Sequence, residues 1–268
     1  MTAKVITFHS YKGGTGKSFL SLNTAAYLAK MEKKNVIVLD YDFRAPTLVH
    51  KFSPDVNDTN FLNEFLEGRQ LIDNVIYDQS KYLTTDGQDF KFHLSYASSK
   101  MHEISEMQMK TRKWQQQALT ILMGGLLKIK NFYDIIIIDS SPGITYDSLN
   151  AMSSSDAVIL VATPDPVDIQ GTVDMSSEIY PSLVKFGAQP ALVLNKIPWE
   201  APNQLYDTEQ ILNKLKIEAD LPVISQCPCF CDASLIYNTI LIKENQNHPL
   251  IKNVKEIVKH LNSIKPRE

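Results

Sequence analysis

Short, almost wholly apolar runs recur along this chain of 268 residues, and amphipathic stretches separate them. Two of the runs, Ile135–Ile138 and Val158–Val161, contain no polar residue. A strand without a polar side is buried on both faces, and this burial is typical of a parallel sheet that helices cover on both sides. The sequence therefore predicts an α/β fold, with a doubly wound, mostly parallel β-sheet and helices on both faces.

The individual elements follow from hydrophobic periodicity. The predicted strands are Lys4–His9, Asn35–Asp40, Phe92–Ala97, Asp134–Asp139, Ala157–Thr163, Pro190–Leu194 and Leu221–Ser225. The predicted helices are Lys17–Lys30, Asn60–Leu66, one around Glu103–Lys130, Ile169–Phe186, Asp207–Ile217, Ala233–Ile240 and Leu250–Leu261. Because no Gly-, Ser- or Pro-rich linker divides the chain, we expect a single domain over residues 1–268.

Composition narrows the class of protein. A net charge of −3 argues against a globally basic nucleic-acid binder, although it leaves a local basic patch open. No apolar run reaches the roughly 18 residues that span a bilayer, and the first nine residues alternate like a strand instead of forming the core of a signal peptide. The three cysteines, Cys227, Cys229 and Cys231, are an odd and clustered set that does not form a disulfide framework. We expect a soluble, cytoplasmic protein.

A glycine-rich segment, residues 10–18, lies between the first predicted strand and the first predicted helix. Its glycines permit backbone angles that turn successive N–H groups toward phosphate oxygens, and the helix N-terminus adds the positive end of its dipole. Lys17 can reach the β- and γ-phosphates, and the Ser18 hydroxyl can ligate magnesium. The predicted nucleotide-binding residues of this segment are Lys12, Gly13, Gly14, Thr15, Gly16, Lys17, Ser18 and Phe19.

Carboxylates follow two of the buried runs. Asp40 and Asp42 end one predicted strand, and Asp139 ends another, where ligands bind in doubly wound folds. Such carboxylates can hold magnesium through water or orient a water for attack on the γ-phosphate. We predict that Ser18, Asp139 and Asp40 form the magnesium site, while an Asp that only caps a turn or helix stays open for Asp40 and Asp42.

The run Lys12-Gly-Gly-Thr-Gly-Lys-Ser18 resembles the deviant Walker A box of the ParA/MinD family of P-loop ATPases. The resemblance extends from Lys4 to about Leu261. It implies that Lys12 reaches across a dimer interface to the partner's nucleotide, and that Asp42 positions the attacking water. The predicted catalytic residues are therefore Lys12, Lys17 and Asp42.

The resemblance also assigns the base-binding end. Asn195 ends a predicted strand where the family has an adenine-contacting asparagine, and Pro228 lies where the family's backbone also meets the base. Cys227 and Cys229 raise a metal or cluster site as an alternative, but their spacing lacks the usual C-x-x-C pair. We favour small buried thiols that line the nucleotide pocket.

The family implies an ATP- and Mg²⁺-dependent switch that hydrolyses ATP slowly under partner stimulation. Two ATP-bound protomers would form a nucleotide-sandwich dimer that positions, partitions or recruits a cargo, with an unidentified activating or cargo protein. The lysines Lys252, Lys255 and Lys259 leave non-specific DNA binding open, whereas the apolar face of the same predicted helix suits packing on the sheet better than a membrane. Met101–Met109 is expected to fill the core. The alternatives are an ATP-dependent metal-cluster carrier, a nucleotide-holding regulatory scaffold and a small-molecule kinase.

Overall fold

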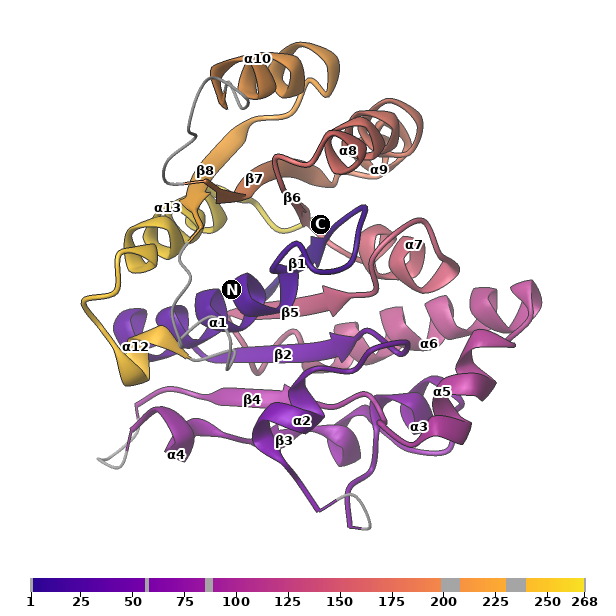
Figure 1. Cartoon of the computed structure of the whole chain (residues 1–268). Coiled ribbons are helices and arrows are strands. Elements are labelled where there is room, and N and C mark those ends of the chain that lie inside the picture. The colour runs from indigo at the N-terminus through magenta and orange to yellow at the C-terminus, as the bar shows by residue number, and fades with distance from the viewer. Residues whose placement is uncertain (1, 56–57, 85–88, 199–207, 230–239, 268) are drawn as a thin grey trace.

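Eight strands form one sheet in the computed structural model, which describes residues 2–55, 58–84, 89–198, 208–229 and 240–267. The sheet order is β3-β4-β2-β5-β1-β6-β7-β8, and every neighbouring pair is parallel except β3 with β4 (Figure 1). The strands are β1 (Lys4–His9), β2 (Val36–Tyr41), β3 (Tyr77–Asp78), β4 (Phe92–Ser95), β5 (Ile135–Ser140), β6 (Ala157–Ala162), β7 (Gln189–Ile197) and β8 (Val223–Pro228). The predicted mostly parallel sheet is confirmed.

Helices cover both faces of this sheet, as the apolar runs predicted (Figure 1). One face carries α1 (Lys17–Glu32), α2 (Leu48–Phe52), α4 (Ser80–Leu83), α12 (Leu241–Glu244) and α13 (Leu250–Ser263). The other face carries α3 (Leu62–Leu66), the 3-10 helix η1 (Ile72–Val75), α5 (Met101–Gln108), α6 (Arg112–Ile129), α7 (Tyr146–Ser153), α8 (Pro166–Glu178), α9 (Tyr180–Lys185) and α10 (Thr208–Glu218).

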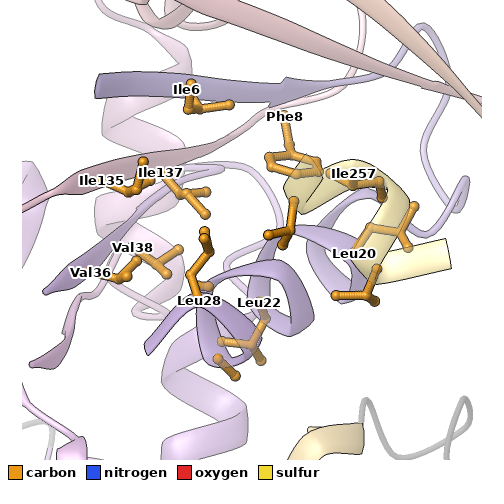
Figure 2. Close-up of a cluster of buried hydrophobic side chains, with 14 of the residues drawn as sticks. Ile6, Phe8, Leu20, Leu22, Leu28, Val36, Val38, Ile135, Ile137 and Ile257 are labelled. Atoms are coloured by element: carbon orange, nitrogen blue, oxygen red, sulfur yellow. The ribbon is translucent and has the colours of Figure 1, made fainter. Parts of the chain in front are cut away.

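Strand β5 illustrates why the apolar runs take this place. Successive side chains of a strand point to opposite faces, so Ile135 and Ile137 enter the core under α1 and α13 while Ile136 and Ile138 enter the core under α3 and α6. Figure 2 shows the first of these cores. All four isoleucines are at most 1% exposed, which requires an apolar residue at every position of the run.

Two predicted helices are each divided in two. The expected helix around Glu103–Lys130 consists of α5 and α6, because the Thr111 side chain accepts the Trp114 N–H and caps a new helix start. The expected helix Ile169–Phe186 consists of α8 and α9, and Pro181, which has no N–H to donate, lies in the first turn of α9. The predicted helix at residues 233–240 lies outside the described residues, apart from Ile240.

The expectation that Met101–Met109 fills the core is wrong for two of its three methionines. Met107 is buried, but Met101 and Met109 are 78% and 72% exposed. Met107 is the one buried residue of the short helix α5, whereas Met101 and Met109 lie at its two ends and face solvent.

Helix α13 packs on the sheet through its apolar face, as expected. Leu250, Ile251, Val254, Ile257, Val258 and Leu261 are buried in the core that α13 shares with α1. Lys4 Nζ donates to the carbonyls of Leu261 and Asn262 at 3.0 and 2.8 Å, which satisfies the C-terminal end of this helix. No helix in the described part of the chain is long and apolar enough to cross a membrane.

The carboxylate of Asp156 joins the first strand to the last described residues. Its Oδ2 accepts the Val5 N–H, and its Oδ1 accepts the Arg267 N–H, both at 2.7 Å. Asp156 is 1% exposed and immediately precedes β6. Segments from the beginning, middle and end of the sequence therefore meet at the amino ends of β1 and β6.

Candidate functional site

The glycine-rich loop connects β1, between β5 and β6 in the sheet, to the N-terminus of α1. Gly14 and Gly16 have φ angles of +79° and +93°, which residues with a side chain rarely adopt, and Gly16 is the N-cap residue directly before α1. Gly16 has no side chain with which to cap the N-terminus of α1. The loop also binds the turn after β5, because the Gly143 N–H donates to the Ser10 carbonyl at 2.8 Å. Loop and helix together offer backbone donors to an anion.

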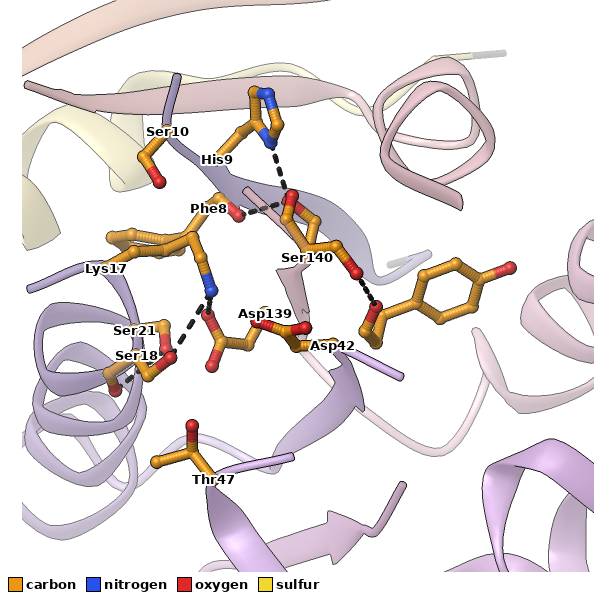
Figure 3. A network of polar contacts seen from close by, with 12 residues as sticks. Phe8, His9, Ser10, Lys17, Ser18, Ser21, Asp42, Thr47, Asp139 and Ser140 are labelled. Carbon is orange, nitrogen blue, oxygen red and sulfur yellow. Dashed lines mark hydrogen bonds and ion pairs between the residues drawn. The ribbon is translucent and has the colours of Figure 1, made fainter. Parts of the chain in front are cut away.

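Lys17 and Asp139 form a buried ion pair at the centre of this region (Figure 3). Lys17 Nζ donates to Asp139 Oδ1 at 2.7 Å and lies 3.3 Å from Ser18 Oγ. The side chains are 6% and 0% exposed. Asp139 Oδ2 is buried and has no hydrogen-bond partner among the described residues. An ammonium, a hydroxyl and an unsatisfied carboxylate oxygen therefore meet at the first turn of α1.

Asp40 lies beside Asp139 in register, on the neighbouring strand β2. Its Oδ2 accepts the N–H groups of Thr47 and Leu48 at 3.1 and 3.0 Å, so it holds the start of α2. Burial, and after it the nearby Asp139 carboxylate, raise the pKa of Asp40 to about 8. Helix capping, the open alternative for Asp40, is thus part of what this side chain does.

Asp42 lies just beyond the end of β2 and also holds backbone. Its Oδ1 accepts the N–H groups of Arg44 and Ala45 at 3.2 and 3.1 Å, in a turn of the type that aspartate favours. Figure 3 shows its carboxylate close to Asp139 and Lys17. Burial raises the pKa of Asp42, and the Lys17 ammonium partly opposes that rise. The three predicted acids are therefore brought together with Lys17 at the carboxyl ends of β2 and β5.

Lys12 points away from this group, toward helix α8. Its Nζ forms an ion pair with Asp165 Oδ1 at 3.0 Å, and the two side chains are 41% and 46% exposed. A cavity of about 370 Å³ lies here, lined by Lys12, Gly13, Gly14, Thr15, Thr163, Pro164, Asp165, Lys196 and Pro198. Lys12 and the loop backbone thus form the wall of an open cavity on the outer side of the loop.

Asn195 and its neighbour hold the loop from the end of β7. Asn195 Nδ2 donates to the Thr15 carbonyl at 2.7 Å, and Lys196 Nζ donates to the Gly14 carbonyl at 2.6 Å. Pro228 of β8 lies opposite Ile197 in register, two residues beyond Asn195. Phe19 packs in the core under α1, so only its backbone faces the loop. Sequence reasoning missed Lys196, whose one signal is its place directly after Asn195.

His9, the last residue of β1, was not predicted to belong to the site. Its Nδ1 lies 2.8 Å from Ser140 Oγ, which itself donates to the Phe8 carbonyl at 2.9 Å (Figure 3). Burial and the neighbouring Lys17 ammonium lower the pKa of His9 to about 3. The imidazole is therefore neutral at physiological pH and adds no charge beside Lys17.

Cys227 lies in the apolar core and does not line the phosphate-loop cavity. Cys227 is buried in the core under α1, and burial raises the pKa of its thiol to about 12, which disfavours the thiolate that metals bind. Cys229 is half-buried, and Cys231 lies outside the described residues. Within the described ranges, no three His, Cys, Asp or Glu side chains form a group that could hold a metal ion.

Comparison with known proteins gives a consistent set of relatives. A family model described as an AAA domain matches residues 3–185. A virulence plasmid ParA family protein of Chlamydia psittaci is 28% identical over 177 residues, which are 63% of this chain and 60% of that protein. The chain thus spans about three-fifths of the length of the curated relatives that it matches.

Solved structures match the whole fold. An ATP complex of McdA from Cyanothece aligns with a TM-score of 0.77 and 18% identity, over 100% of this chain and 99% of that one. The septum site-determining protein MinD from Pyrococcus horikoshii, complexed with Mg-ADP, aligns with a TM-score of 0.71 and 20% identity, over 97% and 96%. At these identities the two structures establish the likeness of the folds.

Proposed function

The chain belongs to the ParA/MinD family of P-loop ATPases, and we propose that it is an ATP-hydrolysing switch that positions, partitions or recruits a cellular cargo. One observation carries this proposal. Lys17, Ser18, Asp42 and Asp139, which come from three separate segments of the chain, meet at the N-terminus of α1. These are the parts that phosphoryl transfer to water requires: an anion cradle, a cation, metal ligands and an acid that can orient water.

The loop residues fit a nucleoside triphosphate. The backbone of Lys12–Phe19 would surround the phosphates, and Lys17 would neutralise the β- and γ-phosphate charge. Asn195, with Pro228 beside it, would contact the adenine, since an amide offers both a donor and an acceptor. Both Asn195 Nδ2 and Lys17 Nζ now bind groups of the chain itself, and they would exchange these partners for nucleotide.

The donor set also fits Mg²⁺, a hard cation that prefers oxygen ligands. Ser18 Oγ and Asp139 would hold the ion, and the unpartnered Asp139 Oδ2 is the observation that supports this assignment. Asp40 would act through a magnesium-bound water from Oδ1, which among the described residues accepts only the Asp42 N–H at 3.4 Å, since its Oδ2 is occupied by the start of α2. Bound there, the ion supplies charge neutralisation for the transferring phosphoryl group.

Asp42 is the proposed carboxylate that orients the attacking water. Its Oδ1 holds two backbone N–H groups, which fixes the carboxylate, and its Oδ2 remains to contact a nucleophile. Lys12 would complete the partner's site from across a nucleotide-sandwich dimer and stabilise charge there, as a cation supplied in trans does in other NTPases. Each protomer would thus be incomplete as a hydrolase until a second copy binds.

Slow, partner-stimulated turnover in the cytoplasm belongs to this proposal, together with an unidentified activating or cargo protein. The names of the relatives, which include a plasmid ParA protein and a septum site-determining MinD, support a role in positioning. Non-specific DNA is a proposed ligand of the exposed lysines Lys252, Lys255 and Lys259 on α13. A membrane suits α13 less well, because its apolar face is buried against the sheet.

Solution mass tests the proposal. Asp42→Ala slows hydrolysis and traps the ATP state, so this variant should be a monomer with ADP and double in mass with ATP and Mg²⁺ in light scattering. Lys12→Ala should bind nucleotide but lose the doubling and the turnover. Lys185→Ala, an exposed lysine on α9, serves as the matched control and should behave like the parent. The same mass with ADP and with ATP would refute the dimer switch. The alternatives would then be a nucleotide-holding scaffold and a metal-cluster carrier, and a measurement of bound iron distinguishes between them.

A further inference from the structure

Two neighbouring side chains at the end of β7 hold successive carbonyl groups of the phosphate loop. Asn195 Nδ2 donates to the Thr15 carbonyl at 2.7 Å, and Lys196 Nζ donates to the Gly14 carbonyl at 2.6 Å. The Asn195 amide also lies against Gly16, so closely that a Cβ at Gly16 would overlap its nitrogen. One end of a single strand therefore fixes three successive positions of the loop.

The backbone at Lys196 makes this double contact possible. Successive side chains of a regular strand point to opposite faces, so two neighbours in a strand do not reach the same loop. Lys196 has a φ angle of +57°, which a lysine rarely adopts, and the pairing of β7 with β8 is irregular between Leu194 and Ile197. This departure from strand geometry brings the Lys196 side chain to the loop that Asn195 also contacts. A backbone conformation of this kind is costly, and it points to a use for Lys196 at the loop.

A carbonyl group that is held in place also orients the N–H of the next residue. The carbonyl and the following N–H of a planar trans peptide point in opposite directions. The bond from Lys196 to Gly14 therefore directs the Thr15 N–H away from the Lys196 ammonium. The bond from Asn195 to Thr15 directs the Gly16 N–H in the same manner, away from the Asn195 amide. Because backbone N–H groups of such a loop are the donors that bind phosphate, the two side chains shape the proposed anion cradle from outside.

We propose that Lys196 is a positioning residue that keeps the phosphate loop in its binding shape and retains this hold when Asn195 turns to a bound base. The inference rests on the proposed function, in which Asn195 exchanges the Thr15 carbonyl for adenine. The Lys196 ammonium keeps the Gly14 carbonyl during that exchange. Without Lys196, this part of the loop has to be ordered at the moment of binding, and the cost of ordering lowers the affinity for nucleotide.

The size of the effect follows from the kind of bond and its exposure. A hydrogen bond from an ammonium group is stronger than one between neutral groups, but Lys196 is exposed, and water weakens the bond. The loss of such a bond changes an affinity by about 5- to 30-fold. Because the loop binds phosphates, the same factor should apply to ATP and to inorganic tripolyphosphate, which has no base.

Three substitutions isolate the ammonium group. Lys196→Met keeps an unbranched side chain and the same backbone requirement at φ +57°, and it removes the donor. Lys196→Arg keeps a cationic donor at this position. The matched control is Lys185→Met, at an exposed lysine of α9. Calorimetry gives the affinity of the parent and of each variant for ATP and for tripolyphosphate, both with Mg²⁺.

Lys196→Met should bind ATP and tripolyphosphate more weakly by the same factor, about 5- to 30-fold, while Lys196→Arg and Lys185→Met should stay within about threefold of the parent. An unchanged affinity in Lys196→Met would overturn the inference. A loss with ATP but not with tripolyphosphate would place Lys196 at the base and would also overturn it. If the parent binds neither ligand, the proposed function itself fails, which is distinct from a parent that binds both and a Lys196→Met variant that binds them equally well.

A second measurement distinguishes a hold on the loop from a direct contact with phosphate. The carbon NMR signal of the Gly14 carbonyl depends on the donor that it accepts, so Lys196→Met should shift this signal without ligand and with tripolyphosphate bound. A Gly14 signal that does not move in either state would overturn the inference, even if the affinity falls. A shift that is present without ligand and absent with tripolyphosphate would show that Lys196 leaves Gly14 for the phosphates, and it would overturn the inference as well.

Discussion

Replacing Lys17 by Met should strand a buried carboxylate, and the cost can be worked from the geometry. At 2.7 Å the attraction between the Lys17 and Asp139 charges is about 6 kcal/mol at an effective dielectric constant of ~20. Desolvation of both charges offsets much of that gain, so the pair itself stabilises little. Removing Lys17 alone has a larger effect than removing the whole pair, because it leaves the charge of Asp139 without a partner. Asp139 is fully buried, and its Oδ2 already lacks a hydrogen-bond partner among the described residues. We expect Lys17→Met to lower the free energy of unfolding by about 3–5 kcal/mol.

A double-mutant cycle tests this reasoning without nucleotide. Urea unfolding of the parent, Lys17→Met, Asp139→Asn and the double variant, followed by circular dichroism, gives the four free energies. The double variant should be more stable than Lys17→Met, with a coupling energy of about 2–3 kcal/mol, because it leaves neither charge of the pair buried without its partner. Lys185→Met, at an exposed lysine of α9, is the control and should change stability little. A Lys17→Met cost below about 1 kcal/mol, or additive single effects, would refute the buried pair.

Three further predictions concern neighbouring residues. Gly171→Ala should destabilise the fold by about 1–3 kcal/mol, because its Cβ overlaps the Tyr11 ring, and Tyr11→Ala should relieve that cost in thermal unfolding. His9 stays neutral in the fold while the unfolded chain takes up a proton below about pH 6.5, so stability should fall by about 2–3 kcal/mol from pH 7 to pH 4.5. His9→Gln should flatten that fall in urea titrations. Asp40, with its pKa raised to about 8, keeps its proton in the folded state up to that pH, while the unfolded chain has already released it. The free energy of unfolding should therefore drop by about 2.5 kcal/mol between pH 6 and pH 8.5 without magnesium. A pH slope that survives Asp40→Asn would contradict this origin.

The sequence predicted those parts of the site that depend on a strand and the residues directly after it. β1 has the predicted bounds, Lys4–His9, and Asp139 lies near the carboxyl end of β5, directly after the apolar run Ile135–Ile138. Lys17 and Asp139 could be placed at one site from these patterns, because adjacent parallel strands bring their carboxyl ends to one edge, but their direct ion pair was not predicted. Predicting that two such residues lie near each other requires only that their strands are parallel neighbours in the sheet.

Other features depend on how distant segments pack, which periodicity does not report. The use of Asp40 as a cap for α2 depends on a turn that returns Thr47 and Leu48 to the end of β2. Asp165 could be recognised locally as a cap, since an aspartate before Pro166 is a helix-start signal, but its pairing with Lys12 could not. Thr111 carried a readable cap signal too, and the continuing apolar period concealed it.

The position of β1 in the sheet has a consequence for synthesis. β1 is synthesised before the other strands of this sheet, yet it lies between β5 and β6, and its Val5 N–H is satisfied by Asp156, 151 residues later. Pairings so distant in sequence close large loops and form slowly. The glycine-rich loop follows β1 directly in the sequence, so it is synthesised long before Gly143 and Asn195, whose hydrogen bonds hold it in the folded protein. A nascent chain that ends before β6 therefore carries the phosphate-binding sequence without a phosphate-binding site.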